Sequence, residues 1–159
     1  MPAARMLSAC VIISTILCFA QPGQAQQETA QYDSALARRL NADQYGMKKY
    51  VMAFLKRGPN RSQDSVTAVK LQRAHLKNIE RMANEGTLVL AGPFLDNGEI
   101  RGIYIFNVET VEEAQALTET DPAIKAGRLV MELHPWYGSA AVQEITAISR
   151  RLMKKSVSD

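Results

Sequence analysis

Segments of strand length alternate with segments of helix length between residues 50 and 133, and this alternation limits the folds open to the chain. In the strand-like segments apolar residues are nearly continuous, whereas in the helix-like segments they recur every three or four positions. Turn residues such as Gly92 and Pro93 separate the segments. The predicted order is strand 50–55, helix 65–84, strand 87–91, strand 102–108, helix 110–119 and strand 129–133.

This order is typical of the ferredoxin-like βαββαβ arrangement, an α+β fold in which two helices cover one face of a four-stranded antiparallel sheet. We assign residues 47–138 to this domain. Residues 142–155 are amphipathic and predict an extra helix, so residues 139–159 are assigned to a basic amphipathic C-terminal helix.

The predicted strands are apolar on both faces, although two helices can cover only one face of the sheet. We therefore expect a second copy of the sheet to cover the other face, and predict a homodimer. Two facing sheets can enclose a cavity, which is a natural place for a small molecule to bind.

The first 25 residues have the features of a secretory signal peptide. Arg5 precedes a mostly apolar run at residues 7–20, and small residues at positions 23 and 25 mark a cleavage site. The run is shorter than the roughly 20 residues that span a bilayer, so we expect cleavage, no stable membrane anchor, and a periplasmic or secreted protein. Cys10 and Cys18, the two cysteines of the chain, lie in this segment. The mature chain is therefore expected to carry out no thiol chemistry.

The mature chain has a nearly balanced charge. The full chain has 19 Lys and Arg residues against 16 Asp and Glu residues, and cleavage removes Arg5 and leaves 18 against 16. Residues 26–46 are polar and predict a linker or surface helix. The clearest basic cluster, within residues 150–155, complements the dipole at the end of the predicted C-terminal helix. No basic stripe with interleaved aromatic residues occurs elsewhere, so no nucleic-acid partner is expected.

His75 stands where a histidine is unexpected, in the apolar stripe of the first predicted helix. Leu71 and Ile79 lie one helical turn before and after it on the same face. A buried imidazole needs a hydrogen-bond partner, and Asp121, directly before Pro122, offers a carboxylate. A carboxylate bound to one imidazole nitrogen fixes the tautomer and leaves the other nitrogen as a general base or acid.

Each of these two residues also has a structural interpretation. His75 can be a core histidine bonded to a backbone carbonyl. Asp121 can cap a short helical turn, with Pro122 in the first helical position.

Several short motifs occur in a characteristic order. They are Arg73-x-His75, Gly86, Gly92-Pro93, Gly102, Glu112-Glu113-Ala114, Asp121-Pro122 and Pro135-Trp136. Over residues 47–137 this ordered set resembles the YCII-related (YciI-like) family. The resemblance implies a dimeric α+β barrel fold and a shared histidine and aspartate, matching His75 and Asp121, as a candidate catalytic pair. The predicted signal peptide and the extensions at both ends depart from the family pattern, which argues against a cytoplasmic metabolic role.

Three further residues are candidates for substrate binding. Arg73 can hold an anionic group, or it can be an exposed helix charge. Glu132 and His134 share one face of the last strand, and they line a ligand cavity if that face points into the space between two sheets. With His75 they suggest a metal site, but their spacing matches no zinc motif, so we predict no metal. We also predict no cofactor.

Two functions of different classes follow from these residues. The first is an exported small-molecule enzyme in which His75 and Asp121 carry out proton abstraction, elimination, isomerisation or hydrolysis. The alternative is a non-catalytic dimeric module for ligand binding or interaction, in which His75 is a structural group.

Overall fold

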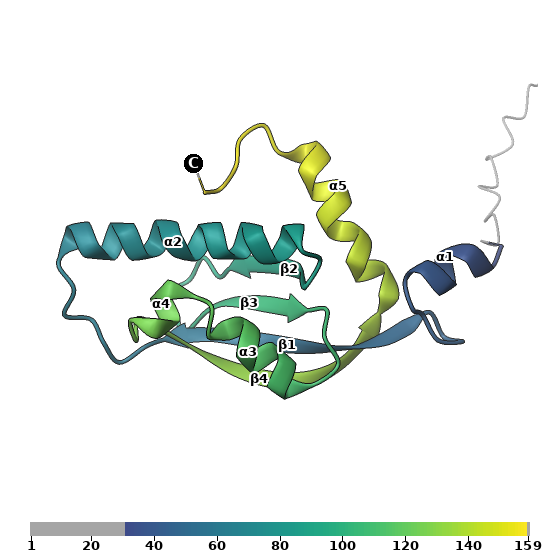
Figure 1. Ribbon diagram of the computed structural model, residues 1–159, viewed down its shortest axis with the longest axis horizontal. Helices are drawn as coiled ribbons and strands as arrows, with labels where there is room; N and C mark the ends of the chain where they lie inside the picture. The colour runs from purple at the N-terminus through teal and green to yellow at the C-terminus, as the bar shows by residue number, and fades with distance from the viewer. Residues whose placement is uncertain (1–30, 159) are drawn as a thin grey trace, which may run out of the picture. The chain divides into compact units, whose positions relative to one another are not determined.

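Four antiparallel strands form one sheet in the order β2-β3-β1-β4 (Figure 1). The strands are β1 (Met47–Arg57), β2 (Leu88–Pro93), β3 (Ile100–Phe106) and β4 (Leu129–Ser139). This computed structural model describes residues 31–158. The predicted signal peptide lies outside the described residues. The predicted α+β fold and the order of its elements are confirmed.

The outer strand β4 is longer than the sequence predicted. Its pairing with β1 runs the whole length of both strands, from Met47 opposite Ser139 to Arg57 opposite Leu129. The polar residues Lys48 and Lys49 continue the ladder, because backbone hydrogen bonding does not require apolar side chains.

Three helices lie on one side of the sheet (Figure 1): α2 (Ser65–Asn84), α3 (Val111–Thr118) and the single turn α4 (Pro122–Lys125). Asp64 caps α2 by accepting a hydrogen bond from the Thr67 amide. Both bonds of the predicted capping box at the start of α3 are present, between Thr110 and Glu113. These caps fix where the helices begin, and so fix which residues of α2 point at the sheet.

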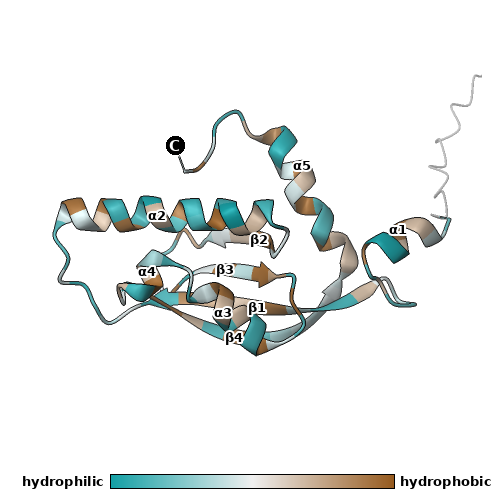
Figure 2. Cartoon of the chain, viewed as in Figure 1, coloured by the Kyte–Doolittle hydropathy of each residue, from teal (hydrophilic) through white to brown (hydrophobic). Residues whose placement is uncertain are grey.

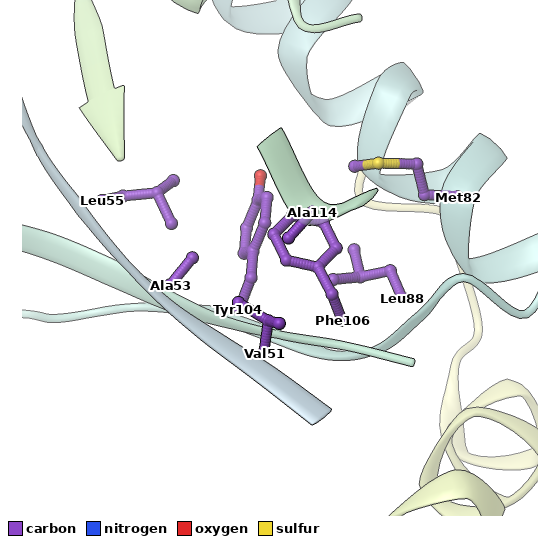
Figure 3. Close-up of a cluster of buried hydrophobic side chains, with 8 residues drawn as sticks. All are labelled: Val51, Ala53, Leu55, Met82, Leu88, Tyr104, Phe106 and Ala114. Atoms are coloured by element: carbon purple, nitrogen blue, oxygen red, sulfur yellow. The ribbon is translucent and has the colours of Figure 1, made fainter. Parts of the chain in front are cut away.

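The main core lies between this helical layer and the sheet (Figure 3). Alternate residues of β1 point toward the helices and are buried, as expected for a strand with a period of two. Helices α2 and α3 contribute Met82 and Ala114. The cluster consists of Val51, Ala53, Leu55, Met82, Leu88, Tyr104, Phe106 and Ala114.

A close backbone approach in the β2–β3 hairpin explains the glycine at position 102. A Cβ atom on Gly102 would lie 2.6 Å from the carbonyl oxygen of Gly92 on the neighbouring strand. Only glycine therefore lets the two strands approach this closely two residues before Tyr104.

The outer face of the sheet is partly covered by the chain itself. A second cluster of Tyr50, Val89 and Ile105 packs against Trp136 and against Val142 from the C-terminal segment. The Tyr50 hydroxyl donates to the carbonyl oxygen of Ser139 over 3.1 Å, which holds the start of this segment against the sheet.

The C-terminal segment is not the single helix that the sequence predicted for residues 142–155. It begins as a 3-10 turn η1 (Ala140–Glu144) and continues as α5 (Ile145–Leu152). The Ser139 hydroxyl caps the turn, so helical structure starts directly after β4, and Met153 adopts extended backbone that ends α5 early. Hydrophilic and hydrophobic residues alternate along α5, as they do along α2 (Figure 2).

Helix α1 (Ser34–Arg39) lies where the sequence predicted a linker or surface helix, and Asp33 caps it. Across residues 31–158, no helix has the length and apolar character needed to cross a membrane.

Candidate functional site

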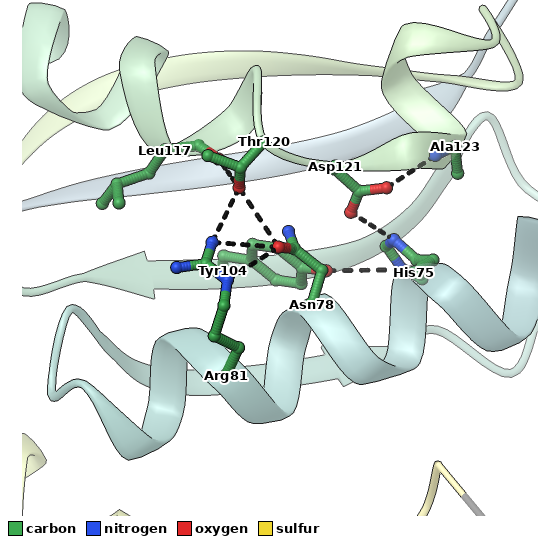
Figure 4. A network of polar contacts seen from close by, with 8 residues as sticks. All are labelled: His75, Asn78, Arg81, Tyr104, Leu117, Thr120, Asp121 and Ala123. Atoms are coloured by element: carbon green, nitrogen blue, oxygen red, sulfur yellow. Dashed lines mark hydrogen bonds and ion pairs between the residues drawn. The ribbon is translucent and has the colours of Figure 1, made fainter.

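His75 projects from α2 toward the start of α4 (Figure 4). Only 6% of the residue is exposed, which agrees with its position in the apolar stripe. Its Nδ1 atom lies 2.6 Å from Oδ2 of Asp121, 46 residues along the chain. The structure therefore brings together the two residues that the sequence singled out as a pair.

Asp121 is fully buried and uses its two carboxylate oxygens for different partners. Oδ2 faces His75, whereas Oδ1 accepts a hydrogen bond of 2.8 Å from the Ala123 amide. Asp121 is thus both the partner of His75 and the N-cap of α4, with Pro122 in the first helical turn. The two interpretations of Asp121 coexist because a carboxylate can accept from several donors.

Tyr104 completes this group from β3, and sequence reasoning did not single it out. Its hydroxyl lies 3.3 Å from Nε2 of His75, and the two rings are stacked with centroids 6.3 Å apart. Two residues after Gly102, Tyr104 shares the helix-facing side of β3 with Phe106. The sequence did offer one signal for this contact. A tyrosine on the helix-facing side of a strand buries its hydroxyl, which then needs a polar partner such as the buried histidine.

The partners of His75 define its tautomer. A carboxylate can only accept, so a neutral imidazole carries its proton on Nδ1 and donates it to Asp121. Nε2 then holds a lone pair, which accepts the proton of the Tyr104 hydroxyl. Burial, and after it the negative charge of Asp121, raises the pKa of Tyr104 far above its usual value, so the phenol keeps its proton.

A second set of polar contacts joins α2 to the end of α3 next to this pair (Figure 4). Oδ1 of Asn78 accepts from the Arg81 guanidinium over 3.0 Å, and Arg81 also donates to the hydroxyl of Thr120. These contacts hold Thr120, the residue directly before Asp121, against α2. The Nδ2 atom of Asn78 is buried, and no partner for it occurs among the residues that the structure describes.

His75 and Tyr104 line an open cavity of about 530 Å³ on the helical side of the sheet. Its apolar wall includes Leu55, Leu76 and Leu129. The volume is in the range that holds a small organic molecule. One chain alone forms this cavity, whereas the ligand cavity predicted from the sequence lies between two facing sheets.

The other predicted binding residues do not join this group. Arg73 is exposed on α2 and does not line the cavity. Glu132 and His134 pair with Phe54 and Met52, so they lie on the outer face of the sheet, away from His75. There they contact each other over 2.7 Å, and Glu132 also binds Lys56. Their role in lining a ligand cavity between two facing sheets stays a prediction.

Metal-ligating side chains do not gather at this site. Among residues 31–158, no group of three or more His, Cys, Asp or Glu side chains is placed to hold a metal ion. The chemistry that the described residues themselves offer is proton transfer by His75 and hydrogen bonding by Tyr104.

The fold and the site together define an α+β domain with a buried histidine and aspartate beside a cavity. Comparison with protein families identifies the domain: residues 50–137, more than half of the chain, match the model of the YCII-related domain. The chain belongs to the YCII-related domain family, as the sequence motifs indicated.

One solved structure that matches is 5-chloro-2-hydroxyhydroquinone dehydrochlorinase (TftG) from Burkholderia phenoliruptrix AC1100, in complex with 2,5-dihydroxybenzoquinone. The identity is 20% and the TM-score 0.41, over 54% of this chain and 92% of that chain. Among curated proteins no match is found.

The raised pKa of Tyr104 predicts a stability change at alkaline pH. Above about pH 10 the unfolded phenol releases its proton while the folded phenol keeps it. The folded state then binds more protons, so stability falls as pH rises, by about 1.4 kcal/mol per pH unit for this one group. Urea unfolding between pH 9 and about 11 should show a shallower fall for Tyr104→Phe. Tyr45→Phe, which removes an exposed phenol, is the control, and an equal slope for wild type and Tyr104→Phe would contradict the prediction.

Proposed function

We propose that this protein is a small-molecule enzyme in which His75 acts as a general acid and base. The observation that carries the proposal is the arrangement of its imidazole, which is bound to Asp121 through Nδ1 and to Tyr104 through Nε2, while His75 and Tyr104 both line the cavity. The reaction classes that this arrangement supports are proton abstraction, elimination, isomerisation and hydrolysis. All of them need a group that takes a proton and returns it.

The proton transfer follows from the tautomer. Nε2 of the neutral imidazole accepts a proton from a substrate or from a water molecule, and the imidazolium that forms donates through Nδ1 to the carboxylate of Asp121. Because Asp121 is fully buried, its negative charge acts on the imidazolium with little screening by water. Asp121 is a positioning residue, since it acts through His75.

Tyr104 supplies a second function to the same cavity. Its protonated hydroxyl can give up the hydrogen bond to Nε2. It can then donate to an oxygen of the substrate that gains negative charge during the reaction. This exchange frees Nε2 for the substrate proton. A general base and a hydrogen-bond donor thus meet at one wall of the cavity.

The capping bond from Asp121 to Ala123 supports the alternative, a non-catalytic binding module. In that case the His75, Asp121 and Tyr104 contacts only fasten α2 to α4 and β3. The two functions differ in what happens when the imidazole is replaced: a module keeps its ligand, whereas an enzyme loses turnover.

The test is proton exchange in deuterated water with a panel of small ketones, lactones and phenols, followed by NMR. Wild type is expected to exchange an acidic C–H proton of at least one compound, and His75→Gln should reduce that rate by about 10² to 10⁴. The control is His134→Gln, which removes the other histidine of the chain, on the outer face of the sheet, and should leave the exchange rate unchanged. Exchange that survives in His75→Gln, or that is lost only in His134→Gln, would contradict the assignment of the site.

We also propose that the protein is exported and forms a homodimer through the outer face of its sheet. Phe54 and Val130 lie on this face, and Val130 is 41% exposed. A second copy would cover these side chains, together with Glu132 and His134.

Sedimentation of residues 26–159 tests the homodimer. Wild type should sediment as a dimer, and Phe54→Lys, which places a charge on the outer face, should shift it to a monomer. Val66→Lys changes an exposed apolar residue of α2 and is the control. A monomeric wild type, or a dimer that Phe54→Lys leaves intact, would count against this interface.

A further inference from the structure

The cavity beside His75 is lined by four arginines that come from separate parts of the chain. Arg57 ends β1, Arg61 lies in the following loop, Arg101 is in β3, and Arg128 directly precedes β4. Among residues 31–158, no Asp or Glu lines the same cavity. Four positive groups therefore gather at one cavity without a lining residue that neutralises them.

The arginines are held in place but not neutralised. Arg61 donates to the carbonyl oxygen of Arg128 over 3.1 Å, Arg128 donates to the side-chain amide of Gln63, and Arg101 donates to the carbonyl of Asp96. All three acceptors are uncharged. Within residues 31–158, none of the four arginines forms an ion pair, and Glu99, whose carbonyl accepts from the Arg57 amide, directs its carboxylate to Lys56.

The arginines also repel one another. Desolvation, followed by repulsion from Arg128, Arg57 and Arg101, lowers the pKa of Arg61. A guanidinium group stays charged at neutral pH even so. Bringing like charges together costs free energy that a bound anion recovers, and guanidinium pairs match the geometry of carboxylate and phosphate oxygens.

The remaining wall of the cavity indicates the other part of the ligand. Leu55, Leu76, Ile79 and Leu129 are aliphatic, and His75 and Tyr104 reach the same space. A ligand that satisfies both walls has an apolar body and an anionic group. An anionic group held by the arginines would orient the rest of the molecule in the cavity that His75 lines.

We propose that the substrate of this site is a small organic anion, whose carboxylate or phosphate group binds the four-arginine wall and whose apolar body lies against the aliphatic wall. The inference rests on the proposed function in one respect, that the ligand is a substrate. Binding of the anion itself depends only on the arginines. Arg73, the arginine that the sequence offered for this role, lies outside the cavity.

Calorimetric titration of the full chain with benzoate, benzamide and inorganic phosphate tests the inference. Benzoate and benzamide share a shape and differ in charge. We expect benzoate to bind at least about tenfold more tightly than benzamide, phosphate to compete with benzoate, and added salt to weaken both anions.

The variant Arg57→Gln/Arg61→Gln should weaken benzoate at least about tenfold. The matched control is Arg38→Gln/Arg151→Gln, which removes the same charge from exposed sites on α1 and α5 and should leave benzoate binding unchanged. Arg128→Gln provides a second, independent variant if the double variant does not fold, as judged by circular dichroism.

The outcomes separate this inference from the proposed function. Benzoate that still binds to His75→Gln, while Arg57→Gln/Arg61→Gln loses it, supports the anion site whether or not His75 is catalytic. Exchange activity that depends on His75, with benzamide binding as tightly as benzoate, would overturn the anion site and leave the proposed function standing. The anion site would also be overturned if the Arg38→Gln/Arg151→Gln control lost as much benzoate affinity as Arg57→Gln/Arg61→Gln. The same holds if neither benzoate nor phosphate binds at millimolar concentration.

Discussion

The hydrogen bond between His75 and Asp121 joins α2 to α4 over 46 residues of chain. A buried bond to a charged acceptor is worth about 1.5 to 3 kcal/mol, and leaving either partner unpaired costs a similar amount. The site depends on this bond in two ways. It holds α2 in the register that points His75 at Tyr104, and it sets which imidazole nitrogen carries the proton.

The sheet supplies the other half of the site through strand periodicity. Residues of β1 and β3 that face the helices form the core, and Tyr104 is one of them, so its hydroxyl reaches His75 from the sheet side. The same alternation places Glu132 and His134 on the opposite face. One face of the sheet thus contributes Tyr104 to the group around His75, and the uncovered part of the other face is where we propose that a second copy binds.

The order of strands and helices and the pairing of His75 with Asp121 could be predicted from the sequence. Periodicity and caps are local signals, and a histidine in an apolar stripe requires a partner. The contact of Tyr104 with His75 was not predicted: strand periodicity places the tyrosine on the helix-facing side of β3, but not opposite a particular turn of α2. The arginine wall also escaped prediction, because Arg57, Arg61, Arg101 and Arg128 meet only through the sheet register and two loops. The end of α5 at Leu152 could not be predicted either. It is set by the extended backbone of Met153, whereas the apolar periodicity that predicted the helix contains no information on backbone angles.

In the proposed site, Asp121 fixes the proton of His75 on Nδ1 and leaves Nε2 unprotonated at its contact with Tyr104. The most direct measurement is the ¹⁵N chemical shifts of the His75 ring in wild type and in Asp121→Asn at a pH where the ring is neutral. Wild type should show a protonated Nδ1 and an unprotonated Nε2. In Asp121→Asn the new amide can keep the Ala123 bond through its oxygen and donate to Nδ1, which should move the proton to Nε2. The same tautomer in both proteins, or a wild-type ring protonated on Nε2, would contradict the account.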